Sequence, residues 1–247
     1  MGHRPPLGNV LVLDEEDGLA QALRSRGAAA QVTRGPFGFD QRATDLVQEA
    51  RRQLGGIDAL VTVFPAIDLA FLDDLEPRAW LDWFRRRVEE PFCLVQAWLR
   101  DALARGAAGR WVAVTSNLGT LPFPSGGAVG AAAAALHTLV RVAAVEYGPR
   151  GIRANAVAVG WYEGALPPAL ESDGAALAVE DTPARRLANL DDVAGTVAWL
   201  LSLEASFVNG EVVRLDGGYT ITRSSRAAPS QALELRLLEE RWRGVAR

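Results

Sequence analysis

Few side chains in this sequence of 247 residues can exchange a proton near neutral pH, and their types narrow the possible chemistry. There is no lysine, so all 26 basic residues are arginine, and every reaction that needs a lysine ammonium is excluded. His3 and His137 are the only histidines and Cys93 is the only cysteine. This composition argues against a zinc site and against an internal disulfide framework. We therefore expect no metal, and we expect Cys93 to be a buried apolar residue.

Two further groups of polar residues could do chemistry. The three tyrosines are Tyr147, Tyr162 and Tyr219, and none is followed by a lysine. Four acids stand together at 14–17, directly after an apolar run. Acids at the start of a helix cap its free N–H groups and interact favourably with its dipole, so a structural role fits them well.

The elements that must position these groups alternate between apolar strands and amphipathic helices, which is typical of a doubly wound parallel sheet. We expect strands at 10–13, 29–33, 58–63, 110–115, 152–159 and 211–215. We expect helices at 18–26, 40–54, 77–105, 126–147 and 190–203, the third interrupted near Pro91 because proline removes a helical hydrogen bond. The pattern predicts an α/β fold with one Rossmann-like domain over 1–222. Residues 223–247 are predicted to be a C-terminal extension, partly helical.

Composition excludes several classes of protein. The net charge of −4 and the lack of a basic tract argue against nucleic-acid binding. No apolar run approaches the length of a membrane span, and the first residues have no signal-peptide core. We therefore expect a cytoplasmic protein that binds neither nucleic acid nor membrane.

Three stretches of the second half carry a resemblance to a known family. Residues 146–160 read E-Y-G-P-R-G-I-R-A-N-A-V-A-V-G, close to E-x-x-P-x-G-I-R-x-N-x-V-x-P-G. Arg186 with 190–194 matches R-x-x-x-P-E-D-V-A, and 206–218 matches a pattern that ends in D-G-G. On these motifs, in order and spacing over 110–220, the chain resembles the short-chain dehydrogenase/reductase family. The resemblance implies a Rossmann-like fold.

The resemblance also implies where the site lies. Ser116 falls on the family serine, and the positions of the family's catalytic Tyr and Lys fall on Val129 and Ala133, neither of which can transfer a proton. The family's active-site Asn falls on Arg87, which could bind an anion facing Ser116 or belong to a solvated charged face. Trp161 and Tyr162 stand in the loop that covers the substrate in the family. The candidate pocket is therefore formed by Ser116, Arg87, Trp161 and Tyr162, while His137 is expected to be a core or interface residue.

The family's nucleotide-binding features are the second point of comparison. The glycine-rich turn expected after the first strand corresponds to the acids at 14–17, followed by Gly18 alone. Only 33–39 stands where the family places another helix and strand. Arg34 could correspond to a ligand of the NADP 2′-phosphate, but we expect no pocket to present it. From these differences the sequence predicts that neither NAD nor NADP is a cofactor.

Three functions follow from this comparison. The first is a non-redox homologue (a pseudoenzyme) that serves as a binding or partner subunit, forming a homo-oligomer or a hetero-oligomer with a related reductase through the alanine-rich helix at 126–147. The second is a cofactor-independent enzyme that acts on a small molecule with Ser116 and the Tyr162 loop. Tyr219 and Arg223 resemble the catalytic pair of halohydrin dehalogenases, but they lie past the last strand. The third function is an NAD(P)-dependent oxidoreductase.

Overall fold

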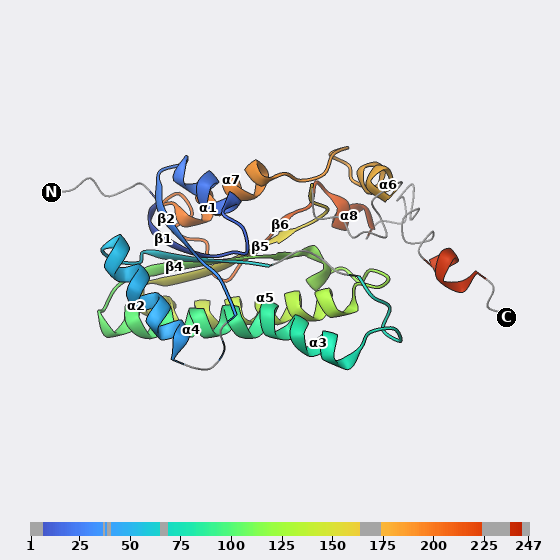
Figure 1. Cartoon of the computed structure of the whole chain (residues 1–247). Coiled ribbons are helices and arrows are strands. Elements are labelled where there is room, and N and C mark those ends of the chain that lie inside the picture. The colour runs from blue at the N-terminus through green and yellow to red at the C-terminus, as the bar shows by residue number, and fades with distance from the viewer. Residues whose placement is uncertain are drawn as a thin grey trace.

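The structure, a computed structural model, describes residues 7–36, 38, 41–64, 69–163, 174–223 and 238–243. Its centre is a six-stranded parallel sheet with the order β2-β1-β3-β4-β5-β6 (Figure 1). The strands are β1 (Gly8–Leu13), β2 (Ala28–Thr33), β3 (Ala59–Val63), β4 (Gly109–Ser116), β5 (Ile152–Val159) and β6 (Val212–Leu215). The predicted α/β fold and all six predicted strands are confirmed, with ends that differ by at most two residues.

Helices cover both faces of the sheet, which explains why the strands are apolar along their whole length. One face packs against α2 (Arg42–Leu54), α4 (Glu90–Ala104) and α5 (Gly127–Tyr147), and the other against α1 (Gly18–Arg24) and α7 (Leu190–Leu201) (Figure 1). Successive side chains of β4 point to opposite faces of the sheet. Trp111 and Ala113 enter the core under α4 and α5, whereas Val112 and Val114 enter the core under α1 and α7.

The predicted interruption of the helix at 77–105 is present one turn before Pro91. The segment consists of α3 (Pro77–Phe84), a π-helical turn (Arg85–Glu89) and α4. Pro91 has no N–H group, so the hydrogen-bond ladder must change next to it. The ladder widens there, because the Glu90 N–H donates to the carbonyl of Arg85, five residues earlier.

The first half of the fold is short, as predicted. β2 ends at Thr33 and the next described element, α2, starts at Arg42. Among the described residues β2 is the outermost strand of the sheet and pairs with β1 alone. The shortening therefore removes sheet from the outer edge and leaves β1, β3 and β4 in the interior.

Some elements were not predicted. The structure adds α6 (Gly174–Asp181), α8 (Tyr219–Arg223) and the short 3₁₀ turns at Asn117–Gly119 and Gly148–Arg150. Residues 238–242 are helical, and Arg241 forms ion pairs with Asp73 and Asp74, while most of the predicted extension lies outside the described residues.

The alanine-rich helix raises the question of a membrane span. Within the described residues, the segment 127–150 is the one helix long and apolar enough to cross a bilayer. Half of its most apolar 18-residue window is buried inside the fold, where α5 packs against β4 and β5. Such burial is typical of a core helix.

Candidate functional site

A cleft of about 480 Å³ lies at the carboxyl edge of the sheet. In the sheet, β2 lies on one side of β1 and β3 lies on the other, so the direction of winding reverses at β1. This reversal opens a crevice beyond the carboxyl ends of β1 and β3. The residues that line the cleft include those directly after four neighbouring strands: Asp14, Glu15 and Glu16 after β1, Phe64 after β3, Ser116 at the end of β4, and Gly160, Tyr162 and Glu163 after β5. Four separate strands thus converge on one cavity.

Ser116 stands at the base of this cleft. It is the last residue of β4 and is only 3% exposed, and its Oγ accepts a hydrogen bond of 3.2 Å from the Leu118 N–H. That bond caps the 3₁₀ turn at 117–119 and fixes the hydroxyl at the strand end. Ser116, one of the four residues of the candidate pocket, thus lines this cleft.

Tyr162 lines the same cleft and is held by its backbone. A parallel bridge joins it to Ala188, with hydrogen bonds of 2.9 Å from the Glu163 N–H and 2.8 Å to the Trp161 carbonyl. Gly160 permits this path, since a Cβ there would lie 2.7 Å from the Cβ of Asp216. Burial raises the pKa of Tyr162, and the nearby carboxylates of Glu16, Glu163 and Asp14 raise it further. The phenol therefore keeps its proton at neutral pH.

Asp14 is the most perturbed acid of the cleft. Its pKa is raised from 3.8 to about 6, mainly because partial burial disfavours the charged carboxylate. The Glu16 N–H donates to its Oδ1 at 3.3 Å and opposes that shift. A backbone N–H that could face a ligand is therefore engaged by the protein's own side chain.

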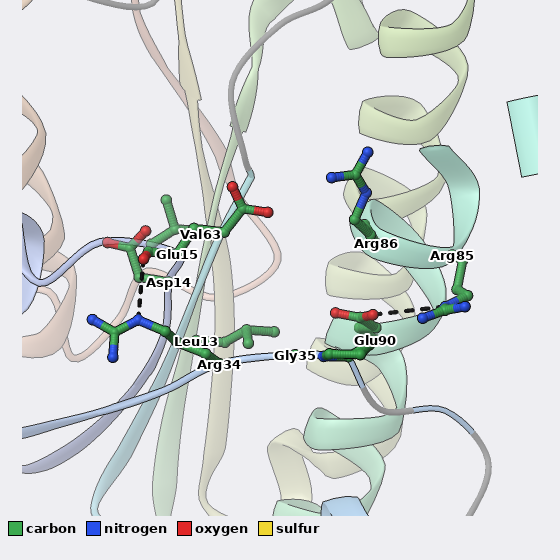
Figure 2. Close-up of a pocket in the computed structure, with 10 residues that line it drawn as sticks. Leu13, Asp14, Glu15, Arg34, Gly35, Val63, Arg85, Arg86 and Glu90 are labelled. Atoms are coloured by element: carbon green, nitrogen blue, oxygen red, sulfur yellow. Dashed lines mark hydrogen bonds and ion pairs between the residues drawn. The ribbon is translucent and has the colours of Figure 1, made fainter. Parts of the chain in front are cut away.

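A second cavity, of about 390 Å³, adjoins the cleft and corrects one expectation. Arg34 lines it together with Arg85, Arg86 and Glu90, so a pocket does present Arg34. Figure 2 shows Asp14, Glu15 and Arg34 on one side of this cavity and Arg85, Arg86 and Glu90 on the other. The Arg34 Nε donates to the Glu15 carbonyl at 3.1 Å, and Arg85 lies 3.8 Å from a carboxylate oxygen of Glu90. The expectation was wrong because the short connection after β2 brings Gly35 against Glu90, and these two residues form part of the cavity wall.

The structure does not bring the other two predicted pocket residues into the cleft. Arg87 is 2% exposed, with its guanidinium 3.3 Å from the ring centre of Trp83 and 5.4 Å from that of Phe64. The prediction of a solvated charged face is therefore wrong for Arg87, because the π-helical turn rotates it inward among aromatic rings. Trp161 is also buried, packing edge-on against Phe123 and Tyr219 at 5.2 and 5.9 Å between ring centres.

Val129 and Ala133 are both completely buried on α5. One turn further along the same helical face, His137 is buried as well, and its Nε2 lies 2.8 Å from the Thr115 Oγ1. His137 is thus a core residue, in keeping with the first of the two expected roles. The pairing of His137 with Thr115 could not be predicted from the sequence, although Thr115 precedes Ser116 and His137 lies one helical turn after Ala133.

The strand order, the reversal between β1 and β3 and a polar cleft at that point define a doubly wound, Rossmann-like α/β protein. The family model described as enoyl-(acyl carrier protein) reductase matches residues 9–220. The chain belongs to the short-chain dehydrogenase/reductase family.

Several relatives have named activities. The chain is 35% identical over 213 residues to a cis-4-hydroxycyclohexanecarboxylate dehydrogenase of Sinomonas cyclohexanicum, covering 85% of this chain and 84% of that one. It is 30% identical over 173 residues to a 3-oxoacyl-[acyl-carrier-protein] reductase of Salmonella typhimurium, covering 70% of each chain. A gluconate 5-dehydrogenase from Burkholderia cenocepacia, solved in complex with NADP and tartrate, superposes with a TM-score of 0.76 at 25% identity, covering 87% of this chain and 96% of that one.

These similarities correct the functional prediction. The sequence favoured a non-redox partner subunit, on the strength of a few residues at the family's catalytic and nucleotide-binding positions. Similarity to named dehydrogenases and reductases extends over most of the chain and favours an NAD(P)-dependent oxidoreductase instead. The prediction gave too much weight to single positions and too little to the whole fold.

Proposed function

We propose that this protein is an NAD(P)-dependent oxidoreductase that acts on a small hydroxy or keto compound. The observation that carries the proposal is the cleft at the reversal of strand order, which is the ligand-binding position of doubly wound sheets. The hydroxyl of Ser116 and the protonated phenol of Tyr162 both line that cleft. The named activities of the relatives support the same reaction class.

The residues of the two adjoining cavities fit most of a nicotinamide dinucleotide. The cavities share Asp14, Glu15 and Val63 among their lining residues, so they lie side by side along the edge of the sheet. Arg34 and Arg86 supply guanidinium groups that would hold phosphate at one end, and Ser116 supplies a hydroxyl at the other. When bound, the nucleotide would supply hydride transfer.

One part of the cleft departs from the family pattern. We propose that the acids at 14–17 stand in place of the glycine-rich turn, and that Val129 and Ala133 stand in place of the family's Tyr and Lys. The Glu16 N–H already donates a hydrogen bond to Asp14, so phosphate binding would depend more on the arginines than on the backbone of this turn. Tyr162, which keeps its proton, would then donate the hydrogen bond that orients the substrate oxygen.

Two further parts of the proposal concern the assembly and the location of the protein. We propose a cytoplasmic homo-oligomer that associates through α4 and α5. An exposed or half-exposed stripe of small and apolar side chains on α5 supports this interface: Ala131, Ala135, Thr138, Val142 and Val145.

The test is titration calorimetry with NAD⁺, NADH, NADP⁺ and NADPH, followed by a substrate panel. The panel should contain alicyclic hydroxy acids, sugar acids and 3-oxoacyl thioesters, with nucleotide absorbance at 340 nm as the readout. We expect binding of at least one nucleotide and turnover of at least one hydroxy or keto compound. Failure of all four nucleotides to bind at millimolar concentration would overturn the proposal.

A further inference from the structure

The cleft at the reversal of strand order has an unusual distribution of charge. Four carboxylates line it, from Asp14, Glu15 and Glu16 after β1 and from Glu163 after β5. Among the described residues, no arginine or histidine lines this cleft. The adjoining cavity has three arginines, Arg34, Arg85 and Arg86, beside the carboxylates of Asp14, Glu15 and Glu90. The lining of the cleft is therefore negative, whereas that of the adjoining cavity is mixed.

The carboxylates of the cleft act on the phenol of Tyr162. Glu16, Glu163 and Asp14 all raise the pKa of Tyr162, so their field reaches the phenol from two different loops. Phe64 and Tyr162 provide aromatic surface in the same cleft. Carboxylates beside aromatic rings form a favourable environment for a flat organic cation.

Ser116 provides an independent indication of a ligand. Ser116 is only 3% exposed, and it lines the cleft. Its Oγ accepts a hydrogen bond from Leu118, but among the described residues no acceptor is found for its own hydroxyl proton. A buried O–H without an acceptor is costly, so the cleft is suited to a ligand that brings an acceptor oxygen.

We infer that this cleft selects the oxidised nicotinamide ring, a cation that carries a carboxamide oxygen, over the reduced and uncharged ring. The inference rests on the proposed function. The two forms of the nucleotide share the same adenosine and phosphates, so the difference between their affinities isolates the charge of the ring. Carboxylates stabilise the cation and leave the neutral ring nearly unaffected.

The selection has a consequence for the direction of the reaction. Tighter binding of the oxidised form lowers the reduction potential of the bound nucleotide pair, which makes reduction of the bound nucleotide less favourable. The protein would thus bind the oxidised nucleotide even when the concentration of that nucleotide is low. The reduced nucleotide, which is a product of the reaction, would dissociate more readily because it binds more weakly. In the oxidation of an alcohol, a bound nucleotide would accept the hydride from the carbon, and the hydroxyl proton would pass to solvent.

The experiment measures dissociation constants for NAD⁺ and NADH by calorimetry, with the wild type and three variants. We expect wild type to bind NAD⁺ more tightly than NADH. Glu16→Gln and Glu163→Gln remove exposed carboxylates of the cleft, and each should reduce this preference by roughly two- to fivefold. Asp45→Asn, on the exposed surface of α2 and outside both cavities, is the matched control and should leave the preference unchanged.

A second probe separates the inference from the proposed function. Saturation-transfer NMR with 1-methylnicotinamide and nicotinamide compares a cationic ring with a neutral one, without any phosphate. We expect 1-methylnicotinamide to bind more strongly, and Glu163→Gln to weaken it. If neither dinucleotide binds while the cationic ring is still preferred, the proposed function fails and the selection for charge stands. Equal affinity for the two rings, or a preference that both glutamine variants leave intact, would overturn the inference.

Discussion

At the scale of the residue, Tyr162 is the side chain on which the proposed chemistry depends most. Tyr162→Phe removes the hydroxyl and keeps the ring and its packing. We expect kcat/KM for the substrate found in the panel to fall about 100-fold or more, because positioned proton donors typically contribute that much. Steady-state kinetics measures the effect, and the nucleotide dissociation constant should stay within about twofold.

Tyr147→Phe is the matched control, since Tyr147 ends α5 and packs against the core away from both cavities. A loss of activity in the control as large as that in Tyr162→Phe would show that the phenol of Tyr162 has no special role.

Val129 and Ala133 allow a test of whether the buried face of α5 can accommodate larger or charged side chains. Introducing the family's pair, Val129→Tyr with Ala133→Lys, forces a large ring and an ammonium into completely buried positions. Space is short there, because even a Cβ added at Gly119 would lie 3.0 Å from the Cβ of Ala133. We expect a loss of at least about 3 kcal/mol in the free energy of unfolding, and no gain of reductase activity.

Urea denaturation measures that loss. Gln48→Lys, on the exposed side of α2 and away from α5, is the control and should change stability by less than about 0.5 kcal/mol. A double variant that is as stable as wild type and consumes NAD(P)H faster would contradict the burial argument.

At the scale of the element, the sequence predicted most of the fold and only part of the site. Strands such as 110–115 and 152–159 are continuous apolar runs, which identify buried parallel strands without tertiary information. Ser116 and Tyr162 could be placed because they end or follow such strands. The burial of Arg87 could not be predicted, because it depends on a π-helical turn whose rotation is set by packing against Trp83 and Phe64.

The helix α5 carries the prediction about assembly. Ala135→Glu places a charge in the middle of the exposed stripe on α5, where burial in an interface would cost several kcal/mol. We expect wild type to sediment as a dimer or larger and the variant to shift toward monomer. Gln48→Glu, on the exposed side of α2, is the control and should not shift the sedimentation. A monomeric wild type would rule the interface out.

At the scale of the whole molecule, two buried groups make stability depend on pH in opposite directions. Burial, with a contribution from Arg141, lowers the pKa of His137 from 6.5 to about 4. Between these values the unfolded chain binds a proton that the folded chain does not. The contribution of His137 is therefore fully present above pH 6.5 and is lost as the pH falls toward 4.

Asp14 acts in the other direction. Its pKa is raised from 3.8 to about 6, so the folded chain holds a proton there that the unfolded chain releases, and stability is lost as the pH rises from about 4 to 6. Asp14→Asn should therefore raise the free energy of unfolding above pH 6 and leave it nearly unchanged near pH 4. Urea titrations at several pH values measure this difference, and Gln48→Asn, a substitution between uncharged residues on the exposed side of α2, should show no such dependence. A variant with the same gain at every pH would contradict the raised pKa.

The outer position of β2 has an evolutionary consequence. None of its six residues is charged or proline, and its connection to α2 is short. Because the cleft is built from the ends of β1, β3, β4 and β5, gain or loss of sequence after Thr33 alters the border of the sheet and the adjoining cavity that Arg34 and Gly35 line, but not the cleft itself. Insertions and deletions at this point can therefore accumulate without moving Ser116 or Tyr162, so length in this part of the chain is free to diverge while the cleft keeps its shape.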